Sequence, residues 1–137
     1  MTNNLWFYFR DASTAAEEDD DLTGSTYYPL SSLRGMCSGT ADETGTVTDT
    51  AAAFSMFFTP KGIISTDADG ASEIDVVVVT ISTDNNQKAV MDAIMDKVVA
   101  SPHGNTGVIT VLDLNKGGTA VKIHDDIASM VVIHAHQ

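Results

Sequence analysis

The sequence has few cysteines, few basic residues and no long apolar run, and each shortage excludes a class of protein. One cysteine, Cys37, cannot form a disulfide within the chain. Seven basic residues against 19 acidic ones give a formal net charge of −12, which repels nucleic-acid phosphates. We therefore expect no direct binding to nucleic acid. The lack of a leader or an apolar run predicts no signal peptide and no contact with a membrane.

The glycines are also uninformative about chemistry, because they are scattered through predicted turns. The sequence contains neither a phosphate-binding loop nor the glycine pattern of dinucleotide sites. It also lacks a basic stripe with interleaved aromatic residues. We expect no cofactor. The hydrophobic content of 43% does suffice for a core, and the length predicts a single domain, residues 1–137.

The segment LWFYFR, near the start, is the most aromatic part of the chain and predicts a strand. Its side chains alternate, with Leu5, Phe7 and Phe9 on one face and Trp6 and Tyr8 on the other. Later segments that predict strands are TYYPLSSLRGM, AAFSMFFTP, EIDVVVVTIS, TGVITVLDL, AVKIH and ASMVVIHAH.

One helix is predicted over residues 85–101, where apolar residues recur at helical spacing and Pro102 and Gly104 follow. Before it, the apolar run 76–79 predicts a strand buried on both faces. The unit from Ile74 to Leu114 reads as strand, helix and strand, which favours a parallel crossover.

The predicted order of elements is β-β-β-β-α-β-β. It indicates an α+β fold, a mostly antiparallel six-stranded sheet or flattened barrel with one packed helix. Residues 11–26 and 37–50 read as long loops, and such loops are common places of contact with partners.

The closest pattern to a metal site is HAH at the end of the chain. On a strand, His134 and His136 point to one face, and His124, Asp125 or Asp126 could complete a ligand set. The simpler interpretation makes the two histidines the polar positions of a terminal strand. We predict no metal site from this spacing alone.

Two other motifs lack the context that their chemistry needs. The sequence around Cys37, GMCSG, has the form of a nucleophile elbow, but the following residues are poor helix formers. It is interpreted as a turn with a small thiol. Asp67, Asp69 and Gly70 match part of a calcium loop, but Val76 stands where a glutamate is required. A turn is favoured, with loose binding of a divalent cation as the alternative.

Five acids, residues 17–21, stand in a row after the aromatic segment. They could mimic DNA phosphates, bind cations, or form a solvated loop that keeps an assembly soluble and protects a strand edge. Like-charge runs are usually solvated, and that interpretation is favoured here.

Several segments give the chain a resemblance to small acidic proteins of marine tailed phages. They are NNLWFYFR, the acidic run, YYPLSSLRGM, QKAVMDAIMDKV and SPHGNTGVI, together about half of the chain. The resemblance implies a virion or assembly protein, located in the virion or the host cytoplasm, and it brings no enzymatic residues.

We therefore predict a non-enzymatic structural subunit that forms symmetric homo-oligomers, such as a capsid decoration protein. Its expected partners are copies of itself and a capsid or other virion protein. The alternatives are an acidic inhibitory binder such as a DNA mimic, and a metal-binding protein that uses the C-terminal histidines.

Aromatic residues dominate interface energetics, although burial in the core would be their ordinary role. The predicted contact residues are Trp6, Tyr8, Tyr27, Tyr28, Phe57 and Phe58.

Overall fold

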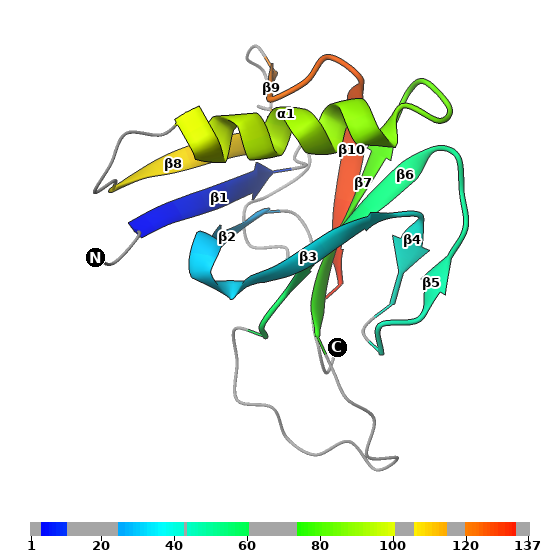
Figure 1. Ribbon diagram of the computed structural model, residues 1–137, viewed down its shortest axis with the longest axis horizontal. Helices are drawn as coiled ribbons and strands as arrows, with labels where there is room; N and C mark the ends of the chain where they lie inside the picture. The colour runs from blue at the N-terminus through cyan, green and yellow to red at the C-terminus, as the bar shows by residue number, and fades with distance from the viewer. Residues whose placement is uncertain are drawn as a thin grey trace, which may run out of the picture.

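Over the residues that it describes, the computed structural model shows an α+β fold with one α-helix and mostly antiparallel strands (Figure 1). This confirms the predicted class. The prediction of one six-stranded sheet or flattened barrel is wrong, because the strands divide into two four-stranded sheets and a two-stranded hairpin. The residues that the structure describes are 4–10, 25–42, 44–60, 74–100, 106–114 and 120–133.

The first sheet, sheet A, has the strand order β2-β1-β8-β9. Strand β1 pairs antiparallel with β2 and parallel with β8, and β9 adds a short antiparallel edge. The predicted alternation of the first strand is confirmed, since its odd-numbered apolar side chains are buried. The strands are β1 (Asn4–Arg10), β2 (Ser25–Pro29), β8 (Thr106–Asp113) and β9 (Val121–Lys122).

The second sheet, sheet B, is antiparallel throughout and has the order β10-β7-β6-β3. Strand β7 lies inside the sheet, and its four consecutive valines, 76–79, are all buried. The prediction of an interior strand buried on both faces is confirmed. The strands are β3 (Leu33–Ser38), β6 (Ala53–Phe58), β7 (Asp75–Ile81) and β10 (Ile127–Ile133).

The sequence predicts TYYPLSSLRGM as a weak strand that Pro29 limits to an edge or an irregular course, and the structure divides it into two strands, each at the edge of a sheet. Strand β2 ends at Pro29, a 3-10 turn (Leu30–Ser32) follows, and β3 then begins in the other sheet. Proline has no N–H to donate and fixes its own φ, so the chain changes direction where Pro29 stands.

Residues 37–50 contain more regular structure than a loop. Strand β3 extends through Ser38, and β4 (Thr40–Ala41) pairs with β5 (Val47–Thr48). Gly39, at φ +103°, allows the turn into this hairpin, because a Cβ there would lie 2.6 Å from the Thr48 carbonyl oxygen. The part of the loop 11–26 before residue 25 lies outside the described residues.

Helix α1 (Gln87–Ala100) falls within the predicted range and contacts both sheets, through β8 and β3. The predicted parallel crossover between its flanking strands is wrong, because β7 belongs to sheet B and β8 to sheet A. Among the described strands, the parallel pair is β8 with β1 instead. The chain thus passes between the sheets repeatedly, and α1 connects them across the top of Figure 1.

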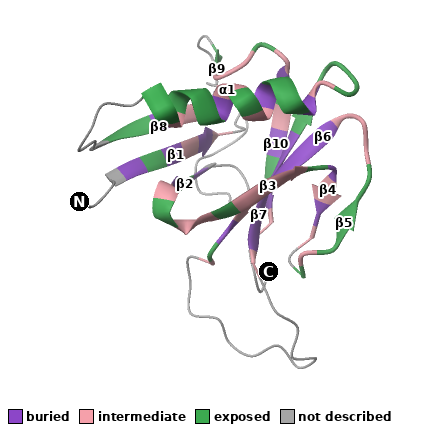
Figure 2. Cartoon of the chain, in the orientation of Figure 1, coloured by how far each residue is buried: buried purple, intermediate pink, exposed green. Residues whose placement is uncertain are grey.

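The main core lies where the two sheets and α1 meet. Both sheets contribute aromatic and aliphatic side chains, and the helix contributes Val90 and Ile94. Figure 2 shows this pattern as buried residues along β1, β6 and β7, with exposed residues on the outer side of α1. A smaller cluster on the opposite face of sheet B includes Ala41, Val76 and Val78, where β4 covers part of that face.

Candidate functional site

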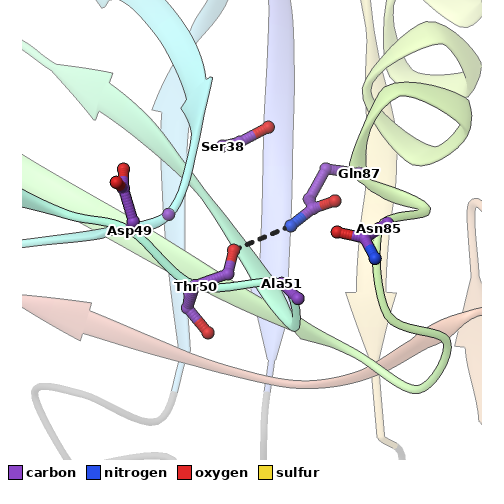
Figure 3. Close-up of a pocket in the computed structure, with 7 residues that line it drawn as sticks. Ser38, Asp49, Thr50, Ala51, Asn85 and Gln87 are labelled. Atoms are coloured by element: carbon purple, nitrogen blue, oxygen red, sulfur yellow. Dashed lines mark hydrogen bonds between the residues drawn. The ribbon is translucent and has the colours of Figure 1, made fainter.

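A polar pocket of about 530 Å³ lies beside the start of α1 (Figure 3). Gln87 is buried there, and its side-chain amide donates to the Thr50 carbonyl oxygen at 2.9 Å. The backbone N–H of Asn85, a residue at φ +66°, donates to the Ala51 carbonyl oxygen at 2.8 Å. These bonds attach the β7–α1 connection to the segment before β6. The pocket is lined by Ser38, Gly39, Asp49, Thr50, Ala51, Asn85 and Gln87.

The lining of this pocket offers little for catalysis. It contains the Asp49 carboxylate, the Ser38 hydroxyl and two side-chain amides, but neither an imidazole nor a thiol. A serine nucleophile needs a base within hydrogen-bond distance, and the structure shows no hydrogen bond between Ser38 and Asp49. The Gln87 side-chain amide and the Asn85 backbone N–H connect backbone segments, so the observed role of these two groups is structural.

Of the candidate metal ligands, the structure describes His124, Asp125 and Asp126, whereas His134 and His136 lie outside the described residues. The Nδ1 atom of His124 accepts the backbone N–H of Asp126 at 3.0 Å, within the turn between β9 and β10. Within the described residues, no three histidine, cysteine or acidic side chains come together as a metal site would require. A site that includes the C-terminal histidines stays a hypothesis.

Cys37 was expected in a turn, and the structure places it in strand β3, opposite Ser55 of β6. Its side chain is half-buried. A nucleophile elbow requires a strand followed immediately by a helix, and here β3 is followed by β4. The motif therefore lacks the geometry of an elbow. The acidic run 17–21 and the calcium-like residues Asp67, Asp69 and Gly70 lie outside the described residues.

Two of the six aromatic residues predicted at an interface belong to the core. Tyr28 and Phe58 are fully buried, with their rings stacked at a centroid distance of 4.2 Å. Burial within the chain removes both from any surface that a partner could touch, which corrects the prediction for them. Phe57 is partly buried against the smaller cluster on sheet B, beside Val76.

The other three aromatic residues come together on the outer face of sheet A. Trp6 and Tyr8 alternate with the buried residues of β1, and Tyr27 lies opposite Tyr8 on β2. The Tyr8 and Tyr27 rings are 4.5 Å apart between centroids. Val108 of β8 lies beside Trp6 and extends the surface. This aromatic face consists of Trp6, Tyr8, Tyr27 and Val108.

The aromatic face is open to solvent in the single chain. Trp6 is 42% exposed, Tyr27 48% and Val108 55%. The sequence analysis does not identify Val108, because it predicts TGVITVLDL as an apolar strand without assigning its faces. The available signal was the polar Thr110 two residues later, which marks Val108 as belonging to the solvent-facing set.

Comparison of the chain with protein-family models, curated proteins and solved structures gives no significant match. Within the described residues, no helix has the length and apolarity that crossing a membrane requires.

Proposed function

We propose that this protein is a non-enzymatic structural subunit that assembles symmetrically with copies of itself through the aromatic face. The concrete form that we propose is a repeated surface subunit of a phage-like particle, such as a capsid decoration protein. The observation that carries the assembly proposal is the exposure of Trp6 and Tyr27 on one continuous sheet surface. The resemblance to acidic phage proteins supports the second part of the proposal, that the assembly belongs to a phage-like particle.

The chemistry of the aromatic face suits association. Tryptophan and tyrosine are enriched among the residues that contribute most to binding, because they bury large areas at a small entropic cost. Single exposed apolar residues are ordinary on a protein surface, whereas neighbouring ones on adjacent strands make a patch. Trp6 and Val108 are register neighbours, and so are Tyr8 and Tyr27. A two-fold axis through such a patch would place it against itself.

Light scattering coupled to size-exclusion chromatography tests the proposal. We expect wild-type protein to form a discrete oligomer at micromolar concentrations and the double variant Trp6→Ser, Tyr27→Ser to be monomeric. The matched control is Val99→Ser, because Val99 is an 80% exposed apolar residue on α1, away from the aromatic face. Circular dichroism would show that all three proteins are folded.

A wild-type monomer throughout the micromolar range would overturn assembly through this face. So would a double variant with the same mass as the wild type. Dissociation by Val99→Ser alone would move the interface to the helix.

A further inference from the structure

A groove of about 460 Å³ runs along one side of β8, next to β9 and the C-terminal half of α1. It is separate from the polar pocket and adjoins the aromatic face at Val108. We call it the β8 groove. It is lined by Lys97, Val108, Ile109, Thr110, Val121, Lys122 and Ile123.

Among the residues that the structure describes, the backbone edge that borders this groove is paired over only part of its length. On the β9 side, the ladder joins Leu112 and Asp113 of β8 to β9, and the Val111 carbonyl oxygen accepts the Ile123 N–H at 3.0 Å. In the described part of the chain, no strand occupies that side along residues 106–110. The backbone N–H and C=O groups of β8 that do not bond to β1 point toward this side. An edge of this kind is a template for pairing with another strand.

The two faces of the sheet beside residues 106–110 differ in chemistry. Lys122 lies opposite Leu112, a core residue, so its side chain is on the helix-facing side of the sheet. Lys97 comes from α1 itself. On the other side of the sheet lie Val121, opposite Asp113, and Val108, beside Trp6.

The charge of the groove differs from that of the whole molecule. Two of the chain's seven basic residues line it and no acidic residue does, although the formal net charge is −12. At physiological salt the Debye length is about 8 Å, so distant acids are largely screened. The nearby Asp113, opposite Val121, lies 4.0 Å from the Arg10 guanidinium as an ion pair, whereas Lys97 and Lys122 line the groove itself.

We propose that the β8 groove binds an extended peptide segment that alternates acidic and apolar side chains and adds to sheet A as a strand in line with β9. Its acidic side chains meet Lys97 and Lys122 on the helix side. Its apolar side chains lie beside Val108 and Val121 on the outer side. Main-chain hydrogen bonds to residues 106–110 supply affinity, and the alternation supplies specificity. This inference stands without the proposed self-association.

Fluorescence anisotropy with a labelled peptide tests it. The probe has about seven residues, a usual strand length, with glutamate and valine alternating and both termini blocked. We expect saturable binding to the full chain. The variant Lys97→Glu, Lys122→Glu should bind at least about tenfold more weakly, because each change removes an attraction and adds a repulsion.

Three controls make the test decisive. Lys88→Glu changes an exposed lysine of the same helix that lies outside the groove, and it should leave the affinity within about twofold, as remote surface changes do. A peptide with lysine in place of glutamate should not bind. A peptide methylated on alternate backbone nitrogens should also not bind, because it cannot complete the strand pairing.

The titration is also run on the Trp6→Ser, Tyr27→Ser variant, in which association through the aromatic face cannot cover Val108. The absence of saturable binding in both proteins would overturn the proposal. Equal binding of the methylated peptide would reduce the groove to a site for negative charge and would overturn strand addition. If Lys88→Glu weakened peptide binding as much as the Lys97→Glu, Lys122→Glu variant does, overall charge and not the groove would determine the affinity, and the proposal would be overturned.

Discussion

Tyr28 and Asp75 connect the two sheets through a side-chain hydrogen bond inside the core. The Tyr28 hydroxyl of β2 donates to the Asp75 Oδ2 atom of β7 at 2.6 Å. Both residues are buried, at 0% and 2% exposure. Burial, and then the neighbouring Asp75 carboxylate, raise the pKa of Tyr28 above its ordinary value of 10.0. A buried polar pair of this kind is stable only when both members keep their partners.

We expect Tyr28→Phe to lower the free energy of unfolding by about 1–3 kcal/mol, since it leaves the buried Asp75 carboxylate without this donor. Urea denaturation at neutral pH measures the change. Tyr27→Phe, at the exposed neighbouring position, is the control and should change stability by less than about 0.5 kcal/mol. Equal effects of the two substitutions would contradict the assigned role.

The same bond predicts alkaline sensitivity. Because the folded-state pKa of Tyr28 is raised, its contribution is fully present below the unfolded-state pKa of about 10 and declines as the pH rises further. The wild type should therefore lose more stability above that pH than Tyr28→Phe does. If the free energy of unfolding fell equally with pH in the wild type and in Tyr28→Phe, the Tyr28 hydroxyl would not be the source of the alkaline sensitivity.

At the scale of elements, Asp126 holds the β7–α1 connection against the start of β10. Its Oδ2 atom accepts the Thr83 backbone N–H at 3.3 Å and the Asn86 side-chain amide at 3.1 Å. The pKa of Asp126 is lowered from its ordinary value of 3.8, mainly by a hydrogen bond from the Thr83 side chain and then by the one from the Asn86 amide, with a smaller contribution from the Thr83 backbone N–H. The residue before the helix is thus held beside a residue that lies 40 positions later in the sequence, directly before β10.

Asp126→Asn should lower the denaturation midpoint at neutral pH and flatten the acid limb of the stability curve. A lowered folded-state pKa contributes stability above the unfolded-state value, and this contribution is lost as the pH falls. Denaturation between neutral and strongly acidic pH measures both effects. Asp125→Asn, at the exposed adjacent position, should behave as the wild type. If the acid limb of Asp126→Asn matched that of the wild type, the stabilising role assigned to the Asp126 hydrogen bonds would be contradicted.

Local patterns predicted those elements whose cause is local. The alternation of β1, the valine run of β7 and the apolar stripe of α1 each report how a segment is buried. The pairing of β8 with β1 could not be predicted, because every apolar strand satisfies the same pattern. The hairpin after Gly39 was missed because two-residue strands carry almost no periodicity.

At the scale of the whole molecule, the net charge of −12 and the aromatic face act in opposite directions on self-association. Copies of the chain repel one another at neutral pH, far above the sequence pI of about 4.3. The apolar contact proposed for Trp6 and Tyr27 is not screened by salt, whereas the repulsion is.

We therefore expect self-association to strengthen as sodium chloride increases. The Debye length falls from about 10 Å at 0.1 M to about 3 Å at 1 M, which removes most repulsion between copies. Sedimentation velocity across this range measures the shift, with the Trp6→Ser, Tyr27→Ser variant as the control that stays monomeric. Dissociation by salt would instead indicate an interface held by ion pairs, and the aromatic face would lose its support.

The sequence by itself determined the class of this protein, its acidity, and which segments bury one face or two. It could not determine which aromatic residues are exposed. Tyr27 and Tyr28 are neighbours of one chemical type, yet one is 48% exposed and the other fully buried. Successive strand residues point to opposite faces, and only the pairing of β2 with β1, and the packing of sheet A against sheet B, decides which face is the core. The aromatic face and the β8 groove exist for the same reason, because both are assembled from strands distant in sequence.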